Sequence, residues 1–167
     1  MVRSIAVACI VLVASGCAQR AATATDGRAT VVRVVDGDTI VVRIGGRDEN
    51  VRLLGIDTPE THKPDTPVEC YGPEATARTA ELIPAGTVVR LERDVEARDR
   101  FDRLLAYVHR AADGLFVERS LIDDGYAAPL VIAPNTAHRA ELEEASAGAR
   151  RGGRGLWAAC GGPHVAR

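Results

Sequence analysis

The stretch "ATVVRVVDGDTIVVRI", residues 29–44, decides the fold, because two runs of β-branched residues stand on either side of Asp36-Gly37. Valine, isoleucine and threonine are typical of strands, and Asp-Gly between two such runs is a strong short-range signal for a hairpin. The sequence therefore predicts antiparallel strands at residues 29–35 and 39–44, joined by a tight turn.

Three more strands are predicted after this hairpin. Their patterns are "NVRLLGI", "GTVVRLE" and "RLLAYVHR", at residues 50–56, 86–92 and 103–110. Each is a short run rich in branched apolar residues. Five short strands with a helix after the third favour the α+β class, mainly β, as a five-stranded OB-type barrel with about three packed helices. The order of elements alone does not separate this barrel from other α+β folds.

Three helices are predicted from their end signals. Gly72, followed by proline and glutamate, starts a helix that stops before Pro84; proline favours the first helical position, and glutamate favours the positive end of the helix dipole. A short helix ends at Gly125. The last helix is expected from Asn135 to about Arg151, with acidic residues early and basic residues late, as the dipole favours.

The start of the chain predicts export. Arg3 precedes an apolar run at residues 5–14 that is too short to span a bilayer as a permanent helix. The sequence "ASGC", ending at Cys17, resembles the lipobox of bacterial lipoproteins, in which the cysteine is lipidated. A plain secretory signal with an incidental cysteine is the alternative. We therefore expect a signal peptide at 1–16, and a protein that is either lipid-anchored to the cell membrane through Cys17 or secreted.

The remaining chain is expected to form a tether at 17–28, one domain at 29–160 and a C-terminal tail at 161–167. The apolar fraction of 46% and the charged fraction of 26% are those of a folded globular protein. The formal net charge is −2, which excludes a global basic field that would attract nucleic acid. A monomer without a protein partner is expected.

Two of the four cysteines, Cys9 and Cys17, belong to the leader. Cys70 and Cys160 remain, and in an exported protein they can form a disulfide that closes a long loop. Two free thiols are the alternative. A metal site is less favoured, because two cysteines without a nearby histidine pair supply too few ligands, and His109, His138 and His164 show no metal-ligand spacing.

Three segments combine carboxylates with arginines: "VVDGDTI", "VRLLGIDTPE" and "RDRFDRLLAYV". Taken singly, each has an ordinary explanation as a turn or a surface ion pair. The second segment poses a geometric problem, since Arg52 and Asp57 would face opposite sides of an ideal strand. Either Gly55 hosts a bulge that restores a shared face, or the strand ends there.

Taken together, these segments resemble the staphylococcal nuclease family, the calcium-dependent thermonucleases. The resemblance runs from about Ala29 to Trp157, through the blocks "DGDT", "RLLGIDTPET", "YGPEA" and "LAYV". It implies an OB-type barrel with three helices, and hydrolysis of DNA and RNA to fragments that end in a 3′-phosphate. By the matching blocks, the catalytic residues would be Arg52, Glu60 and Arg103.

The same blocks imply a Ca²⁺ site formed by the carboxylates of Asp38 and Asp57 and by the backbone of Thr58. Lys63 and Tyr71, in and beside the proline-rich loop, would help to bind substrate. These residue types suit the chemistry, because Ca²⁺ prefers hard oxygen ligands and arginine offers paired donors to phosphate oxygens. A glutamate can take a proton from the attacking water, which gives Glu60 the role of general base.

The chain departs from the family at positions that bind substrate. The proline-rich loop holds one lysine, Lys63, and the tyrosines expected shortly before the last helix are replaced by apolar residues at 131–133. Asp102 stands where the family often has glycine, and its carboxylate could hold Arg103 away from a phosphate. A non-catalytic OB-type lipoprotein that binds nucleic acid or protein is therefore the alternative. Retention of a general base at Glu60 favours catalysis, since a binding module needs none.

Overall fold

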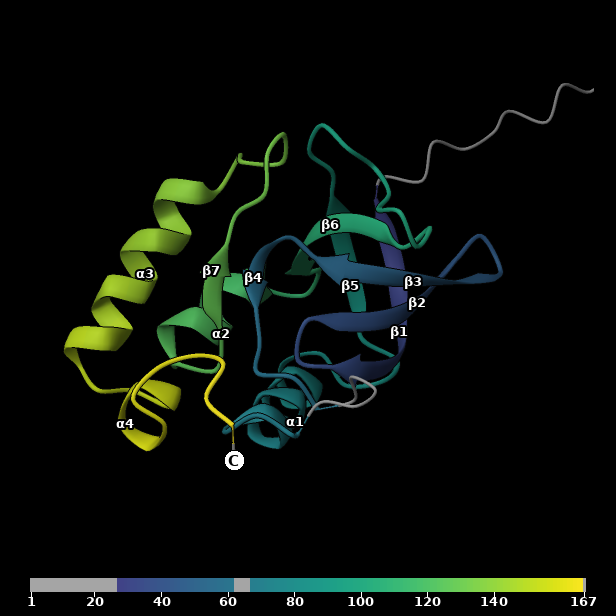
Figure 1. Cartoon of the computed structure of the whole chain (residues 1–167). Helices are drawn as coiled ribbons and strands as arrows, with labels where there is room; N and C mark the ends of the chain where they lie inside the picture. Colours follow the sequence, from purple (N-terminus) through teal and green to yellow (C-terminus); the bar gives the residue numbers. More distant parts are fainter. Residues whose placement is uncertain (1–26, 62–66, 167) are drawn as a thin grey trace, which may run out of the picture.

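The computed structural model describes residues 27–61 and 67–166. Its centre is a closed five-stranded barrel (Figure 1). The strand order is β1 (Arg28–Asp36), β2 (Thr39–Ile44), β3 (Arg47–Leu53), β6 (Leu104–Arg110) and β5 (Val88–Glu92), with β5 pairing back to β1. The predicted fold class, a mainly β protein with a five-stranded OB-type barrel and packed helices, is confirmed.

The first hairpin forms as the sequence predicts, but its turn lies one residue later. Asp36 pairs with Thr39, so the turn residues are Gly37 and Asp38. Gly37 is needed at this tip because an added Cβ would lie 2.6 Å from the hydroxyl of Thr58. The shift matters for the site, since it makes Asp38 one of the two turn residues and puts its carboxylate at the tip of the hairpin.

Strand β3 pairs in parallel with β6, which brings distant parts of the chain together. Val51 lies opposite Leu104, and Arg52 lies opposite Leu105. All other neighbours in the barrel are antiparallel. Arg103, the residue just before β6, is therefore close to the end of β3 that carries Arg52.

The predicted third strand is divided in two. β3 ends at Leu53, the backbone turns at Gly55 with a φ of 78°, and a short β4 (Gly55–Asp57) follows. β4 pairs with β7 (Ala128–Leu130) in a separate two-stranded sheet that the sequence did not predict. Only glycine suits this corner, because a Cβ would collide with the side chain of Leu142.

The helices cover the barrel on two sides (Figure 1). α1 (Gly72–Leu82) lies against β1, while α2 (Val117–Asp123) and α3 (Arg139–Arg151) pack on each other, with the β4–β7 sheet between α3 and the barrel. The four-residue α4 (Leu156–Ala159) was not predicted.

α3 begins at Arg139 rather than at Asn135, because the side chain of Asn135 is hydrogen-bonded to the backbone of Glu96 in a distant loop. Its side-chain oxygen accepts the N–H of Glu96 at 2.8 Å, and its side-chain nitrogen donates to the carbonyl of Glu96 at 3.3 Å. The residue that makes these bonds is buried. Asn135 therefore joins two loops instead of starting a helix.

The core fills the barrel and continues under α2 and α3. Its largest fully buried apolar side chains include Tyr107, Ile40, Leu53, Ile56, Leu121 and Leu142. Glu118 on α2 is also fully buried, and both of its carboxylate oxygens accept the N–H of Val108 on β6, at 2.9 and 3.1 Å. Burial raises the pKa of Glu118 well above its usual range.

The predicted disulfide is present between Cys70 and Cys160, which are 90 residues apart, with a Cα–Cα distance of 6.0 Å. It joins the segment before α1 to the residues that follow α4. Within 27–61 and 67–166, no helix is long and apolar enough to cross a membrane. The predicted signal peptide and Cys17 lie outside the described residues.

Candidate active site

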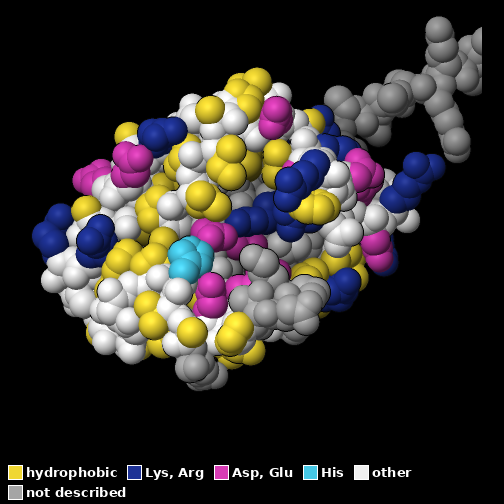
Figure 2. All heavy atoms as spheres, in the orientation of Figure 1, with side chains coloured by type: hydrophobic (Ala, Val, Ile, Leu, Met, Phe, Trp, Pro, Cys, Tyr) yellow, Lys and Arg dark blue, Asp and Glu magenta, His cyan; other side chains and the backbone are white. Residues whose placement is uncertain are grey.

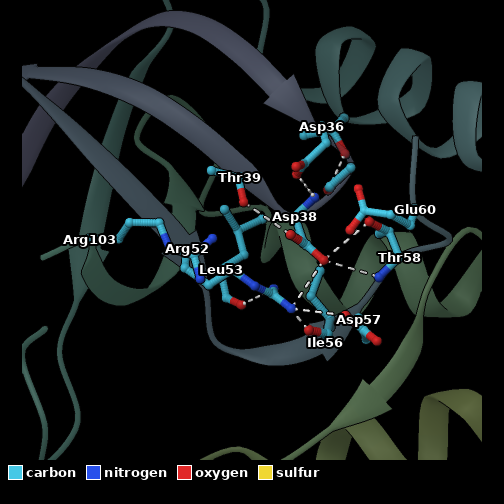
Figure 3. A network of polar contacts seen from close by, with 12 residues as sticks. Asp36, Asp38, Thr39, Arg52, Leu53, Ile56, Asp57, Thr58, Glu60 and Arg103 are labelled. Carbon is cyan, nitrogen blue, oxygen red and sulfur yellow. Dashed lines mark hydrogen bonds and ion pairs between the residues drawn. The ribbon is translucent and has the colours of Figure 1, made fainter. Parts of the chain in front are cut away.

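Asp38 is the innermost carboxylate of the site, with 7% of its surface exposed (Figure 3). Its Oδ2 accepts the backbone N–H of Thr58 at 3.1 Å and the Thr58 hydroxyl at 3.2 Å. Its Oδ1 accepts the hydroxyl of Thr39 at 3.1 Å. The hairpin tip is thereby tied to the end of β4, and buried acceptors of this kind are normally satisfied.

One guanidinium joins the two predicted metal-binding carboxylates. Nη2 of Arg52 lies 3.0 Å from Oδ1 of Asp57 and 3.1 Å from Oδ2 of Asp38. Nη1 donates to the carbonyls of Leu53 and Ile56, at 2.9 and 3.0 Å. The corner at Gly55 makes this possible, since it turns Asp57 back toward Arg52. Of the two explanations left open by the sequence, the structure is nearer to the second: β3 ends at Leu53, and Gly55 begins the separate strand β4.

The carboxylates of this site repel one another. Burial raises the pKa of Asp57, and the negative charge of Asp38 adds to the rise, against the attraction of Arg52. Burial and the charge of Asp38 also raise the pKa of Asp36, to about 6. Asp36 accepts the N–H of Asp38 at 3.2 Å, so it shapes the turn that carries the inner carboxylate.

Glu60, the predicted general base, stands on the loop that leaves β4, on the same side as Thr58 (Figure 3). Its Oε1 accepts the N–H of Thr61 at 3.1 Å. Its backbone is held twice by Glu69: the Glu60 N–H donates to Oε2 of Glu69 at 2.9 Å, and the Glu60 carbonyl accepts the Glu69 N–H at 2.9 Å. Glu69 therefore fixes the loop that presents the base.

Arg103 lies on the other side of Arg52 from Glu60 (Figure 3). Its Nε donates to Oδ2 of Asp99 at 2.7 Å, and its backbone N–H donates to the other oxygen at 2.9 Å. Asp102 keeps the left-handed backbone that glycine favours, with a φ of 63°, but its carboxylate pairs with Arg98 at 3.5 Å. The carboxylate that holds Arg103 is thus Asp99, whereas the sequence pointed to Asp102.

A cavity of about 660 Å³ opens beside these arginines. Four of its lining residues are arginines, and the walls are otherwise partly apolar; among the lining residues are Arg52, Arg98, Arg100, Arg103, Phe101, Leu130 and Ile132. Phe101 is 65% exposed, with the guanidinium carbons of Arg100 and Arg103 at 4.7 and 5.6 Å from its ring centroid. Figure 2 shows basic and acidic side chains gathered in a hollow of one face.

The two predicted substrate-binding residues are placed differently. Tyr71 is the residue before α1, with a φ of 74°, and its ring packs against Tyr126 at a centroid distance of 5.2 Å. It does not line the arginine-rich cavity. Lys63 lies outside the described residues. A role in substrate binding stays a prediction for both.

The residues present fit a hard divalent cation. Asp38 and Asp57 converge on one nitrogen of Arg52, so two carboxylates, the hard oxygen ligands that such an ion prefers, lie close together. Within the described residues, no group of three or more histidine, cysteine or acidic side chains is arranged to hold a metal ion. Further ligands would have to be backbone oxygens such as that of Thr58, water and substrate phosphate, which Ca²⁺ accepts.

Sequence reasoning missed Glu69, Asp99 and His164, each of which contacts a predicted site residue. Asp99 is four residues before Arg103, a spacing that could have suggested a pair. The contacts of Glu69 and His164 depend on loops that meet only in the folded chain, so no local signal indicated them.

Comparison with known proteins agrees with this geometry. The model of the family described as staphylococcal nuclease homologue matches residues 50–159. The thermonuclease of Staphylococcus hyicus is 40% identical over 127 residues, which is 76% of this chain and 73% of that protein. The thermonuclease of Staphylococcus intermedius is 42% identical over 127 residues, covering 76% and 74%. Endonuclease YncB of Bacillus subtilis (strain 168) is 44% identical over 109 residues, covering 64% and 50%. This chain therefore belongs to the staphylococcal nuclease family.

Proposed function

We propose that the protein is a Ca²⁺-dependent endonuclease that hydrolyses the phosphodiester bonds of DNA and RNA and leaves 3′-phosphate ends. The chain is a nuclease by family, and the relatives described above are named thermonuclease and endonuclease. The observation that carries the finer proposal is the placement of Arg52 against both Asp38 and Asp57, beside a cavity lined by three more arginines.

The chemistry requires positive charge around an anionic substrate. A phosphodiester repels a hydroxide nucleophile, and its non-bridging oxygens gain charge in the transition state. Arg103 can offer the planar, permanently charged donors of its guanidinium to those oxygens, and Arg52 would do the same by exchanging its contacts with Asp38 and Asp57 for the phosphate. Hydrogen bonds and ion pairs orient both side chains: Arg52 is bonded to carbonyls and carboxylates, and Arg103 is bonded to Asp99. A Ca²⁺ ion bound at Asp38 and Asp57 would supply further charge stabilisation of the phosphate.

Glu60 serves as the general base that takes a proton from the attacking water. The Glu60 backbone N–H donates to the side-chain carboxylate of Glu69, and the Glu60 carbonyl accepts the Glu69 N–H, so two hydrogen bonds hold the backbone that carries the base. Proton abstraction by a positioned side chain is worth about 10²- to 10⁴-fold in rate. The arrangement assigns charge stabilisation to the arginines and proton transfer to the glutamate.

Low sequence specificity follows from the walls of the cavity. Phe101, Leu130 and Ile132 present exposed apolar surface, which can pack on any base. Asn135, an amide that could read a base edge, has its side chain committed to Glu96. The remaining cationic residues suit the sugar–phosphate backbone, which is the same in every sequence.

We further propose that the protein is exported and held at the membrane by a lipid on Cys17, or secreted after plain cleavage, and that it acts as a monomer. The support for export is the leader sequence and the Cys70–Cys160 disulfide, a bond typical of oxidising compartments. Mass spectrometry of the membrane-extracted protein tests this. An added diacylglyceryl group on Cys17 is expected, and a mature chain without lipid would leave only the secreted form.

The test of the nuclease proposal incubates the purified protein with denatured DNA or with RNA, in Ca²⁺, Mg²⁺ or chelator. We expect cleavage in Ca²⁺ alone, and a fall of about 10²- to 10⁴-fold in kcat for Glu60→Gln. Glu143→Gln, on the exposed face of α3, is the control and should cleave as wild type does. Intact substrate at high protein concentration would favour a binding module, and equal cleavage in chelator would refute the metal.

A further inference from the structure

The C-terminal residues after the disulfide return to the candidate active site. We call residues 161–166 the C-terminal strap. Cys160 tethers its start to Cys70, the Val165 carbonyl accepts the N–H of Cys70 at 2.8 Å, and Ala166 forms a β-bridge with Glu69. The strap is thus attached at both ends to the short segment that also holds the loop of Glu60.

His164, in the middle of the strap, contacts two carboxylates. Its Nε2 lies 3.2 Å from Oδ2 of Asp57, and its Nδ1 lies 3.2 Å from Oε2 of Glu69. Its backbone is left-handed, with a φ of 58°, a conformation that is uncommon for residues other than glycine but is adopted more often by histidine than by most.

These contacts hold Asp57 from both sides. Arg52 contacts Oδ1 of Asp57 and His164 contacts Oδ2, so the orientation of the Asp57 carboxylate is fixed. The same Oε2 of Glu69 that contacts His164 also accepts the backbone N–H of Glu60. A continuous path of polar contacts therefore runs from the strap to one predicted metal ligand and to the backbone of the predicted base.

We propose that His164 is a positioning residue of the nuclease site, and that the disulfide-tethered strap holds it beside Asp57. The proposal rests on the proposed function. His164 sets the orientation of Asp57 for the cation and, through Glu69, steadies the loop of Glu60. Partners that orient metal-binding side chains are typically worth 10- to 100-fold in metal affinity or activity. His164 belongs near the lower end, because half of its side chain is exposed.

The test compares His164→Ala, His164→Gln and the control Val165→Ala, which keeps the backbone bond of the strap and removes no contact to the carboxylates. Calorimetric titration with Ca²⁺ is expected to give about 10-fold weaker binding for His164→Ala. Its kcat should fall while KM for a single-stranded oligonucleotide stays the same. The side-chain amide of His164→Gln can donate to Asp57, so part of the affinity should return. Val165→Ala should match wild type.

A second arm tests the tether. In a Cys70→Ser/Cys160→Ser background, His164→Ala should cause little further loss of Ca²⁺ affinity or of kcat. Without the disulfide, the strap no longer holds the imidazole beside Asp57. If that double variant does not fold, thiol reduction of the folded wild type and of His164→Ala takes its place. If His164→Ala weakens Ca²⁺ binding as much without the disulfide as with it, the proposal is overturned.

The remaining outcomes separate this proposal from the nuclease assignment. Unchanged or tighter Ca²⁺ binding by His164→Ala, with an active wild type, would overturn the positioning role alone; tighter binding would mean that the imidazole competes with the ion. A wild type that binds Ca²⁺ but cleaves nothing would overturn the nuclease function, and the calorimetric comparison would still decide the role of His164. A wild type that binds no Ca²⁺ would overturn the positioning role together with the metal assignment.

Discussion

Arg52 serves structure and chemistry with different nitrogens. Nη1 holds the carbonyls of Leu53 and Ile56 on either side of the corner at Gly55, whereas Nη2 faces Asp57 and Asp38. A lysine has one ammonium group and cannot do both. The arginine therefore shapes the turn that brings its own carboxylate partner into reach.

For Arg52→Lys we expect kcat to fall by about 10²- to 10³-fold, because a point charge cannot replace a planar pair of donors at a transition state. The measurement is steady-state cleavage of an oligonucleotide in Ca²⁺, with a melting curve to check the fold. Arg43→Lys is the matched control, because the guanidinium of Arg43 on β2 pairs with Asp48 on β3 and does not line the cavity. A rate equal to wild type would remove Arg52 from the mechanism.

Phe101 is the exposed aromatic ring at the arginine-rich cavity, and sequence reasoning did not single it out. For Phe101→Ala we expect KM to rise roughly 10-fold with kcat less affected, since stacking of a base on a ring is worth about 1 to 3 kcal/mol. Removal of a ring that is 65% exposed should leave the melting temperature close to wild type. Val88→Ala, an exposed apolar position on β5, is the control; an unchanged KM for Phe101→Ala would place the bases elsewhere.

The residue types of the site could be predicted from sequence, but their pairing could not. Asp38, Arg52 and Asp57 were identified together, and the structure brings them to one point. That Asp99 rather than Asp102 holds Arg103 depends on which side of a turn each carboxylate faces. Spacing along the chain does not specify that choice.

α3 is docked on the barrel through a histidine at its start. His138 Nε2 lies 2.9 Å from Glu92 on β5, and its Nδ1 lies 3.2 Å from Glu141 one turn into the helix. Its ring also packs edge-on against Tyr107, at a centroid distance of 4.5 Å. Burial alone would lower the pKa of His138, but the hydrogen bonds to the two glutamates outweigh it and raise the pKa above its usual 6.5.

This raised pKa makes the attachment of α3 depend on pH. The stabilisation by His138 is fully present below pH 6.5 and is lost as pH rises through the higher pKa of the folded state. At the acid end, the lowered pKa values of Glu92 and Glu141 mean that the stabilisation fades only as pH falls below 4.5, toward those values.

The measurement is denaturant unfolding of wild type and His138→Gln at pH 6 and at pH 8.5. We expect the difference in unfolding free energy between the two proteins to be larger at pH 6. The pKa of neighbouring His109 is lowered, mainly by burial and in part by the charge of His138, so His109 contributes with the opposite dependence on pH. A difference that is equal at the two pH values would contradict the ion-pair role.

Long elements were predictable, and short ones were not. The hairpin strands, α1 and α2 carry clear periodicity and end signals. β4 and β7 have three residues each, and α4 has four, which is too short for any pattern to develop. The start of α3 was misplaced because Asn135 forms long-range bonds to Glu96, and these outcompete a local helix start.

The disulfide constrains the whole chain. It closes a loop between residues 90 positions apart, from Cys70 to Cys160, for which chain entropy gives roughly 4 to 5 kcal/mol of stabilisation as an upper figure. We expect reduction before heating to lower the melting temperature by several degrees. Differential scanning calorimetry with and without a thiol reductant measures it, and an alkylated, never-reduced sample is the control. Coincident curves would show that the bridge adds no stability.

Closure of the barrel is the feature of the whole molecule that sequence could not specify. Antiparallel neighbours follow from short connections, but the parallel pairing of β3 with β6 joins residues 51–53 to residues 104–106. Loop closure over such a separation has no local signature. The resemblance to a known family supplied the barrel, and physical reasoning from the five strands alone left it open.

That pairing also sets how much of the chain must be synthesised before the two arginines can meet. β6 can dock on β3 only after the chain has been made through residue 106, because Leu53 pairs with Ala106. A fragment that ends before residue 103 contains Asp38, Asp57 and Glu60 but lacks Arg103 and the strand that places it beside Arg52. The first two thirds of the polypeptide are therefore the minimum length at which both guanidinium groups can be assembled into one site.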